Sequence, residues 1–486
     1  MASGAYGTNG SGRSAHPGYA AGEPYAVNGH STTSVAEGTD VVAPDDQRPR
    51  ERFIPVTTLA LVDRLTVPEA WPNGDADEAR RLFKYLNFWR RQLHTEHLLK
   101  LLRAYEPFNP DSDLLQTRQY SAQDRKRLQK RVVAGVEHIL KRANYERIDT
   151  SDVERILTKE SHYGLDLHVD FSVFEECIIY YRGASTRRDQ RRQLKKFMRK
   201  EEFDIPIFRR LFLLFKLKAF DAHVAELMTA NPKLTRKEAE RKVKTLRATI
   251  PKEVSDDNIY LKLFKNIPRS DVEMIFPNTR VRFRLMDKIK LSVTGGGALG
   301  MGVFGTAGKI AAGGLTATNP VALAGAVAGL GGIAFRQGVN FMNQKQRYMV
   351  VMAQNLYFHA MADNRGVLIK LSDRAAEEDV KEEMLLYSVL AKVTAKRSDL
   401  PHMDQAIERY LTSTFGVEVD FDLEDALERL EAEGLVQEDA NGVLHTLPPR
   451  AAADHLDAKW DAYLDHLPYT QHAEGSELDI EDFPHA

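Results

Sequence analysis

The sequence predicts an α+β fold, mostly helical with a small sheet, a Gly/Ala-rich two-helix transmembrane hairpin and a C-terminal winged-helix-like unit. Three observations predict it. Long segments carry apolar residues at helical spacing, shorter segments alternate apolar and polar residues, and residues 291–336 are almost uncharged. The chain has 486 residues, enough for two to four domains at about 100–200 residues per domain.

The composition excludes several classes of protein. Hydrophobic residues make up 43% and charged residues 28%, and the mean hydropathy is −0.40. These values exclude a polytopic transporter, a collagen-like fibre and a wholly disordered chain. The single cysteine, Cys177, excludes a disulfide framework and a zinc site made of cysteines.

The first 50 residues are rich in Gly, Ala, Ser and Asn and have almost no periodic apolar residues. Such a segment cannot bury enough surface to offset its ordering entropy, so we expect a disordered tail. Arg13 is the only Lys or Arg before Arg48, and no apolar stretch follows a basic region. Neither a signal peptide nor a mitochondrial transit peptide is therefore predicted.

The middle of the chain predicts helices followed by strands. Helical spacing of apolar residues indicates long helices at 75–105 and 121–142 and a shorter one at 152–157. Alternating or β-branched and aromatic segments then indicate a sheet of four or five strands. The candidate strands are residues 165–170, 174–181, 205–217, 259–264 and 281–285. Residues 205–217 also suit a helix, and the pattern alone leaves both readings open.

The charges are strongly segregated although the net charge is only −2. Residues 182–252 hold 21 Lys and Arg against 8 Asp and Glu, whereas residues 371–486 hold 28 acids against 9 bases. The basic run from Arg187 to Lys200 has a spacing near four, which predicts one positive helix face. Three partners suit that basic segment: anionic lipid headgroups, nucleic-acid phosphates, or the acidic C-terminal region of this chain.

The uncharged stretch predicts the membrane hairpin. Residues 291–308 and 310–335 contain no charged residue, and a helix needs roughly 20 residues to cross the hydrocarbon core. Two spans fit, at 291–315 and 320–336, and basic residues at both ends place both soluble halves on the cytoplasmic side. The alternative is a buried or disordered segment of a soluble protein. Small residues four apart would let the two helices approach closely, namely Gly308, Ala312, Ala324, Gly325, Ala328 and Gly329.

No motif predicts a catalytic, cofactor or metal site. Gly300 to Gly305 matches G-x-G-x-x-G, but no acidic residue follows before Asp363, so no dinucleotide is expected there. His94 and His97 lie one helical turn apart without an identifiable third ligand, so no metal is expected. The sequence therefore predicts no cofactor and gives no positive evidence for an enzyme.

The acidic C-terminal region has the pattern of a winged-helix-like unit. A helix at 403–413 is followed by a second at 422–433, which Gly434 ends, and by a hairpin whose turn is Asn441-Gly442. Such units often bind DNA, but the acidity of this one disfavours contact with phosphates. Packing against protein is the preferred interpretation.

The segment IYLKLFKNIPRSDVEMIFPNTRVRFRL, residues 259–285, resembles the signature of transmembrane protein 143 and its bacterial relatives, a family defined by a domain of unknown function. FIPVTTLALVDRL, KRANYERI, IIYYRG and NLYFHAMADNRGVL are also similar, in the same order, so the resemblance covers about residues 53–390. It implies a two-span membrane protein and supplies no catalytic residues. The motif positions, of unknown role, are Lys262, Lys265, Asn266, Pro268, Arg269, Glu273, Pro277 and Asn278. Pro268 suits a strand end and Pro277-Asn278 a turn, so a structural joint is favoured over an active site.

These observations give one predicted organisation. It comprises a tail (1–50), a soluble α+β domain (51–290), the hairpin (291–336), a helical region (337–398), the winged-helix-like region (399–470) and a tail (471–486). We expect an integral protein of a bacterial inner membrane, a scaffold or interaction protein with the lipid bilayer as one partner. Without a transit peptide, mitochondrial residence is not expected. The alternative is a soluble nucleic-acid-binding or regulatory protein that uses residues 182–252 and the winged-helix-like unit, although nucleic acid is the less favoured partner.

Overall fold

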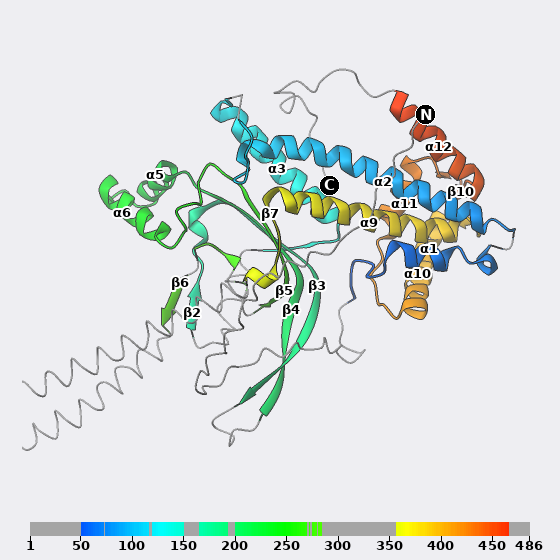
Figure 1. Ribbon diagram of the computed structural model, residues 1–486, viewed down its shortest axis with the longest axis horizontal. Helices are drawn as coiled ribbons and strands as arrows, with labels where there is room; N and C mark the ends of the chain where they lie inside the picture. Colours follow the sequence, from blue (N-terminus) through cyan, green and yellow to red (C-terminus); the bar gives the residue numbers. More distant parts are fainter. Residues whose placement is uncertain are drawn as a thin grey trace, which may run out of the picture. The chain divides into compact units, whose positions relative to one another are not determined.

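The computed structural model describes residues 50–71, 73–115, 119–149, 165–192, 200–269, 272, 275–278, 280–283 and 356–465 (Figure 1). All of them belong to one compact unit, residues 40–486. The helices are α1 Thr58–Leu65, α2 Ala76–Tyr105, α3 Ala122–Arg142, α5 Phe220–Ala230, α6 Arg236–Arg247, α9 Asn364–Leu390, α10 Leu400–Phe415, α11 Leu423–Ala432 and α12 Pro449–Asp465. The strands are β1 Glu146–Ile148, β2 Leu165–His168, β3 Phe174–Arg192, β4 Lys200–Leu217, β5 Tyr260–Pro268, β6 Arg280–Phe283, β7 Ala360–Asp363, β8 Ala395–Lys396, β9 Val436–Glu438 and β10 Val443–Thr446.

The main sheet has five antiparallel strands in the order β1-β3-β4-β5-β7. The predicted number of strands is right, but the membership differs. β2 and β6 pair with each other in a separate two-stranded sheet, while β1 and β7, which the sequence pattern did not indicate, form the edges. These two edge strands have only three and four residues, too few for a visible alternation.

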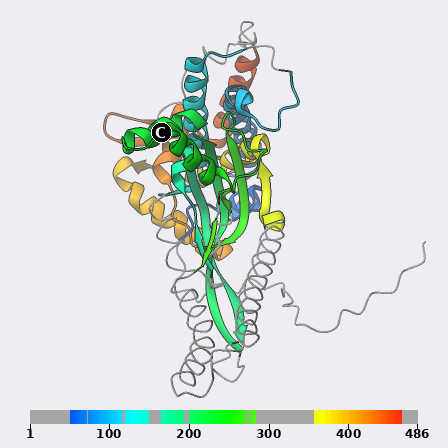
Figure 2. The ribbon, with the colours of Figure 1, turned by 90° about the vertical axis from the view of Figure 1, so that its left-hand side faces the viewer.

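Strands β3 and β4 form a ribbon that continues past their neighbours, as Figure 2 shows. They pair from Phe174 to Arg192, whereas β5 pairs with β4 only from Ile207 to Phe215. The basic run that begins at Arg187 was expected to be helical, and that prediction is wrong. Residues 187–192 belong to β3 and Lys200 begins β4, while residues 193–199 lie outside the described residues.

Both faces of the main sheet are covered, which resolves the ambiguity at residues 205–217. Tyr180, Phe212 and Leu263 pack against α2, α3 and α9, while Leu213 and Phe264 pack on the opposite face. A strand buried on both faces reads as a nearly continuous apolar run rather than an alternating one. The segment is therefore the central strand β4, and its apolar run reflects burial on both sides.

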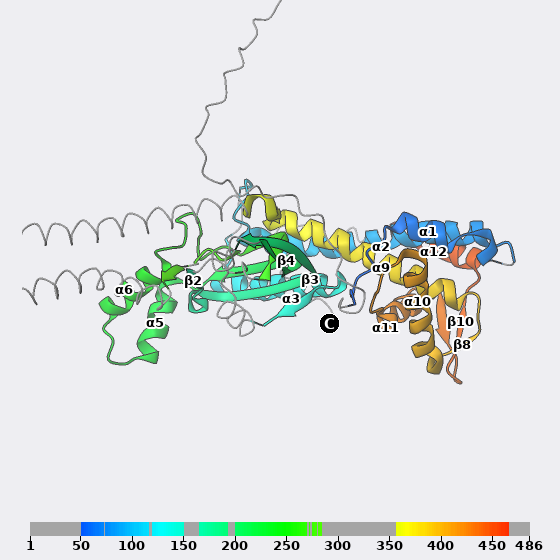
Figure 3. The same cartoon turned by 90° about the horizontal axis from the view of Figure 1, so that it is seen from below.

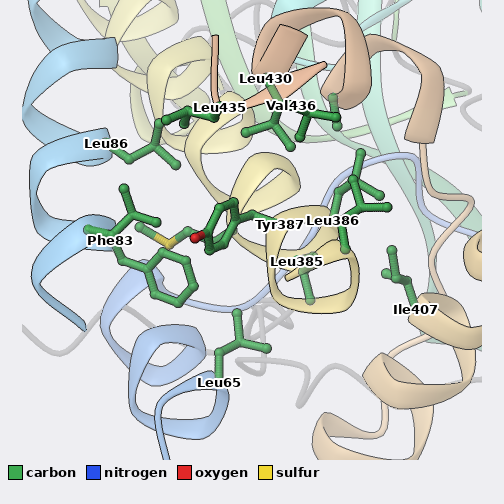
Figure 4. Packing of buried hydrophobic residues seen from close by; sticks show 14 of the residues in the cluster. Leu65, Phe83, Leu86, Leu385, Leu386, Tyr387, Ile407, Leu430, Leu435 and Val436 are labelled. Carbon is green, nitrogen blue, oxygen red and sulfur yellow. The ribbon is translucent and has the colours of Figure 1, made fainter. Parts of the chain in front are cut away.

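Helix α9 joins the sheet to the winged-helix-like unit (Figure 3). Its first half packs with α3 on the sheet, and its second half shares a core with α2, α10 and α11. Figure 4 shows side chains of this core converging on Tyr387. The Phe83 ring meets the Tyr387 ring edge-on at 6.2 Å between centroids, and the Tyr387 hydroxyl donates a hydrogen bond of 2.7 Å to the carbonyl oxygen of Leu447.

The winged-helix-like unit has the predicted order of elements. After α9 come β8, α10, α11, β9 and β10, and the strands form a sheet in the order β8-β10-β9. Gly434 ends α11 at φ 77° and Gly442 closes the β9–β10 turn at φ 75°, both in the left-handed region that favours glycine. α12 then packs on α2. The long helices predicted at 75–105 and 121–142 are also confirmed, as α2 and α3.

The membrane part of the predicted fold class is corrected. No helix in the described part of the chain is long and apolar enough to cross a bilayer. This finding contradicts the predicted transmembrane hairpin and the predicted location in a bacterial inner membrane. The spans assigned to 291–315 and 320–336, and the short helix expected at 152–157, lie outside the described residues.

Candidate functional site

The middle of α9 carries four buried carboxylates on two consecutive turns. Acidic side chains are rarely fully buried unless they are paired. Glu378, Asp379, Glu382 and Glu383 are each at most 4% exposed. A buried charge is costly unless it is paired and hydrogen-bonded, so each of these groups needs a cation nearby. The structure supplies those cations from α2, α3, α11, β3 and α9 itself.

Arg429 of α11 lies at the centre of this buried charge network. Its guanidinium lies 2.5 Å from Oε2 of Glu382 and 2.9 Å from Oε1 of Glu383. Its Nη1 lies 3.7 Å from Oδ1 of Asp379. A planar guanidinium can satisfy several carboxylates at once. Arg429 therefore fixes α11 to α9, and its side chain points away from solvent.

Two further arginines complete the network. Arg90 of α2 lies 2.6 Å from Oε1 of Glu383 and 3.1 Å from Oε1 of Glu433, which also pairs with Lys459 of α12. Arg142 of α3 lies 2.7 Å from Oδ2 of Asp379. The carboxylates of Asp379, Glu382, Glu383 and Glu433 thus face the cations of Arg90, Arg142, Arg429 and Lys459. Because each carboxylate has a cation beside it, the network can stay buried; it holds α2, α3 and α11 on α9, and Lys459 adds α12 through Glu433 at the end of α11.

The pKa values of the network follow from burial and pairing. Burial by itself raises the pKa of Asp379, but the charges of Arg429 and Arg142 outweigh it and hold that pKa below its usual value. Burial raises the pKa of Glu382 to about 7 against the opposing charge of Arg429. Every one of these carboxylates is engaged by a cation. The network therefore has the character of a structural joint rather than of a catalytic centre.

The histidines beside the network have structural partners. His94 Nε2 lies 2.8 Å from Oδ2 of Asp379, and the His97 ring meets the His138 ring edge-on at 6.2 Å. Burial lowers the pKa of His97 and lowers the pKa of His138 to about 4, so both rings are neutral near pH 7. In the described part of the chain no three His, Cys, Asp or Glu side chains are grouped to hold a metal. Burial also raises the pKa of the Cys177 thiol to about 12, which disfavours the nucleophilic thiolate.

The outward surface of the winged-helix-like unit is acidic, and we call it the acidic face. It consists of side chains of α11 and of the β9–β10 hairpin, namely Glu424, Asp425, Glu428, Glu431, Glu438 and Asp439. Glu424 and Glu428 are exposed one helical turn apart, and within the described residues neither forms an ion pair. The only basic residue of α11, Arg429, is buried in the network, where its Nη1 also lies 3.9 Å from Oδ2 of Asp425.

Residues 50–56, which we call the strap, run along the edge of this unit. Glu51 forms a parallel β-bridge with Val419, in which its N–H donates to Glu418 O at 3.1 Å. Arg50 lies 3.0 Å from Oε2 of Glu408, and Arg52 lies 3.8 Å from an oxygen of Asp420. An extended segment with two arginines therefore already lies against acidic residues of the winged-helix-like unit.

The motif positions of the LKLFKNIPR segment do not converge on one site. Lys262 Nζ lies 2.9 Å from Oδ2 of Asp363 across β5 and β7, and the carbonyl oxygen of Lys265 lies 2.7 Å from His359 Nδ1. Asn266 has φ 52°, and Pro268 is the last residue of β5. These positions hold the β5–β7 edge together.

The rest of the motif has a similar role. The Arg269 guanidinium lies over the Phe208 ring at 5.0 Å, and Asn278 Nδ2 donates to Asp170 O at 2.6 Å. Pro277 lies in a turn, as expected, and Glu273 lies outside the described residues. The residues expected to pack the hairpin also lie outside the described residues, namely Gly308, Ala312, Ala324, Gly325, Ala328 and Gly329.

The basic segment 182–252 is divided among β3, β4, α5 and α6. On α6, Ala239 and Val243 are buried, and the exposed Lys237, Arg241 and Lys244 lie on the opposite side of the helix. No ion pair of these three cations occurs within the described residues. α6 is thus a second, positively charged surface, separate from the acidic face.

Comparison with known protein families gives a match that covers part of the chain. Residues 174–366 are similar to a family described as a protein of unknown function, DUF3754. That segment begins at β3 and ends in the first turn of α9, so it includes four strands of the main sheet and excludes the winged-helix-like unit. No solved structure matches the chain. The resemblance to transmembrane protein 143 stays a prediction.

Proposed function

We propose that this chain is an interaction or scaffold protein, and that the acidic face of its winged-helix-like unit binds a basic segment of a partner protein. The observation that carries the proposal is the orientation of α11. Its acidic residues Glu424 and Glu428 are exposed, while its one arginine, Arg429, is buried against α9.

Electrostatics favours a basic partner over nucleic acid at this face. In helix-turn-helix folds the second helix enters the major groove, where nearby phosphates require positive or neutral side chains. α11 occupies the corresponding position and would bring four carboxylates, of Glu424, Asp425, Glu428 and Glu431, toward the phosphates. A basic protein segment is attracted by the same charges, and the attraction also speeds its association.

The strap supports this choice of partner. It shows that the unit accepts an extended segment, with Arg50 beside Glu408 and Arg52 beside Asp420. A main-chain bridge to Val419 accompanies the two ion pairs. A partner that adds a basic strand in this way gains directional hydrogen bonds as well as charge attraction.

The test uses the full chain and two labelled probes, an arginine–alanine repeat peptide and a short DNA duplex, with binding followed by fluorescence anisotropy at low salt. We expect the peptide to bind and the duplex not to bind through this unit. Glu424→Lys with Glu428→Lys should weaken peptide binding about tenfold, since each reversed exposed charge costs of order 0.5–1 kcal/mol.

The matched control is Glu253→Lys with Asp257→Lys, which reverses two exposed carboxylates on the sheet half of the chain. It changes the net charge by the same amount, so a specific site predicts near-native affinity for this variant. Equal loss in both double variants would show attraction to net charge alone and would contradict the proposal.

The exposed cations of α6 favour a second candidate function, nucleic-acid binding by the sheet half. Lys237, Arg241 and Lys244 form one outward stripe that could contact phosphates. If this candidate holds, the full chain binds the duplex with a strong salt dependence, and Lys237→Glu with Lys244→Glu removes that binding. Salt-independent or absent duplex binding would exclude it.

A further inference from the structure

The strap is held by three buried charged side chains. Glu378 and Lys381 of α9 and Arg182 of β3 are 0%, 1% and 6% exposed. Glu378 Oε1 lies 2.8 Å from both Lys381 Nζ and Arg182 Nη2. The three side chains thus form a fixed constellation, which we call the clamp.

The clamp contacts the main chain of the strap. The Ile54 N–H donates to Glu378 Oε2 at 3.0 Å, and Lys381 Nζ donates to the carbonyl oxygens of Ile54 at 2.6 Å and Val56 at 3.3 Å. Main-chain recognition of this kind fixes an extended conformation and is largely independent of the side-chain sequence. Burial of Ile54, which is 1% exposed, adds an apolar anchor.

The neighbouring side chains fit an aromatic residue before the anchor. The Arg182 guanidinium lies 4.1 Å from the centroid of the Phe53 ring, a cation–π contact. Gly183 has φ 73°, and a Cβ there would meet Phe53 at 3.1 Å. Glycine suits this position for two reasons: it adopts the positive φ without strain, and its lack of a side chain lets the strap approach closely.

The strap connects otherwise separate parts of the fold. It touches β3 through the Phe53 ring beside Arg182, α9 through Glu378 and Lys381, and the winged-helix-like unit through Glu408 and Asp420. While it is docked, its two arginines pair with Glu408 and Asp420, two carboxylates of the winged-helix-like unit that are not part of the acidic face. A second extended basic segment would meet the same main-chain donors and acceptors.

We propose that the clamp is a peptide-binding site occupied in cis by the strap, and that its ligand class is an extended segment with arginines followed by an aromatic and an aliphatic residue. A protein partner with such a segment replaces the strap. This second statement rests on the proposed function, because both require a partner that presents an extended basic segment.

The probe for the test is a labelled synthetic peptide with the sequence of residues 48–58. The receptor is the full chain with Arg50→Ala, Arg52→Ala and Phe53→Ala, which weakens the strap at side chains that are exposed or half-buried and keeps Ile54. We expect this variant to bind the peptide at least tenfold more tightly than the unchanged chain, whose own strap competes. Circular dichroism checks that the variant is folded.

A modified peptide makes the test independent of folding. N-methylation of the Ile54 amide removes the donor to Glu378 Oε2 and should weaken binding about tenfold. N-methylation of the Arg52 amide is the matched control and should have little effect. Lys381→Met in the weakened-strap chain should abolish binding, while Lys370→Met, at an exposed position of α9, should leave it unchanged.

The outcomes separate this inference from the proposed function. If the folded weakened-strap variant does not bind the peptide, or binds both methylated peptides equally, the clamp is not a peptide site. The acidic face is tested separately by the arginine–alanine repeat peptide and the Glu424→Lys/Glu428→Lys variant. If the unchanged chain does not bind the repeat peptide, or the double variant binds it as tightly as the unchanged chain, while the clamp binds its own peptide, the proposed function alone is contradicted.

Discussion

The buried network on α9 and the acidic face of the winged-helix-like unit are made of the same residue types but differ in what their charges contact. Neighbouring residues of α11 show the contrast. Arg429 is 6% exposed and forms ion pairs with four carboxylates, three of them on α9, whereas Glu428 is exposed. In the network each carboxylate has a cation, while Glu424 and Glu428 of the acidic face form no ion pair among the described residues.

The comparison separates charges that serve folding from charges that are available for binding. A buried pair is costly to break because the remaining charge stays desolvated. An exposed charge is screened by water and contributes little to stability. Removing one member of the network should therefore lower the free energy of unfolding strongly, whereas reversing charges of the acidic face should mainly change affinity for a basic partner.

The largest expected effect follows removal of the central cation. Arg429→Met leaves Asp379, Glu382 and Glu383 short of a buried positive charge, so we expect a loss of about 3–5 kcal/mol in the free energy of unfolding. Urea unfolding measures it. Glu428→Gln, one residue away, should change stability by less than about 0.5 kcal/mol. Similar losses in both variants would remove the distinction between the two regions.

A smaller effect is expected from His138 beside the network. Its pKa is lowered from 6.5 to about 4, so its protonation favours the unfolded chain. The contribution of neutral His138 to the free energy of unfolding is therefore fully present above pH 6.5. It is lost as the pH falls from 6.5 to 4 and does not change further below pH 4. We expect about 1–2 kcal/mol after allowance for solvent screening.

The measurement compares the chain with its His138→Asn variant in urea unfolding at several pH values. The difference between the two isolates His138, because the raised pKa of Glu382 acts in the opposite direction over part of this range. Parallel curves from pH 7 to pH 4 would show that His138 does not titrate as described.

The smallest effect on stability is expected at Arg397, an exposed cation beside the acidic face. It lies 2.7 Å from Oε2 of Glu438 and 3.6 Å from Oε1 of Glu431. Arg397→Ala should cost less than about 1 kcal/mol, as exposed pairs usually do. Because it frees two carboxylates, it should tighten binding of the basic repeat peptide, which anisotropy measures. Weaker binding would show that the partner does not use this side of the unit.

The spacing of apolar residues and the position of glycines were sufficient to predict the long helices and the order of elements in the winged-helix-like unit. α2 and α3 have 30 and 21 residues with apolar residues at regular spacing, and Gly434 and Gly442 mark the turns around β9 and β10. The acidity that defines the acidic face was also visible in the sequence. The sequence pattern did not show which way each side chain points, and in particular it did not show that Arg429 is buried.

The buried network could not be read from local pattern because its partners are distant in sequence. Arg90 and Glu383 are almost 300 positions apart, and Arg182 meets Glu378 only after the sheet packs on α9. A weak signal did exist. Carboxylates at 378, 379, 382 and 383 recur on one side of a helix that also needs an apolar stripe. The FIPVTTLALVDRL segment, noted above for its resemblance, includes Phe53 and Ile54 of the strap, but its pattern could not show the contacts of the strap because Glu378 and Lys381 lie more than 300 positions away.

Zero-length cross-linking tests the binding role of the acidic face most directly. A lysine-containing basic peptide is incubated with the full chain, a carbodiimide joins lysines to adjacent carboxylates, and mass spectrometry identifies the sites. We expect cross-links at Glu424, Glu428 and Glu438, and none at the exposed Glu253 or Asp257. Cross-links spread evenly over exposed carboxylates, or confined to the sheet half, would contradict a binding role for the winged-helix-like unit.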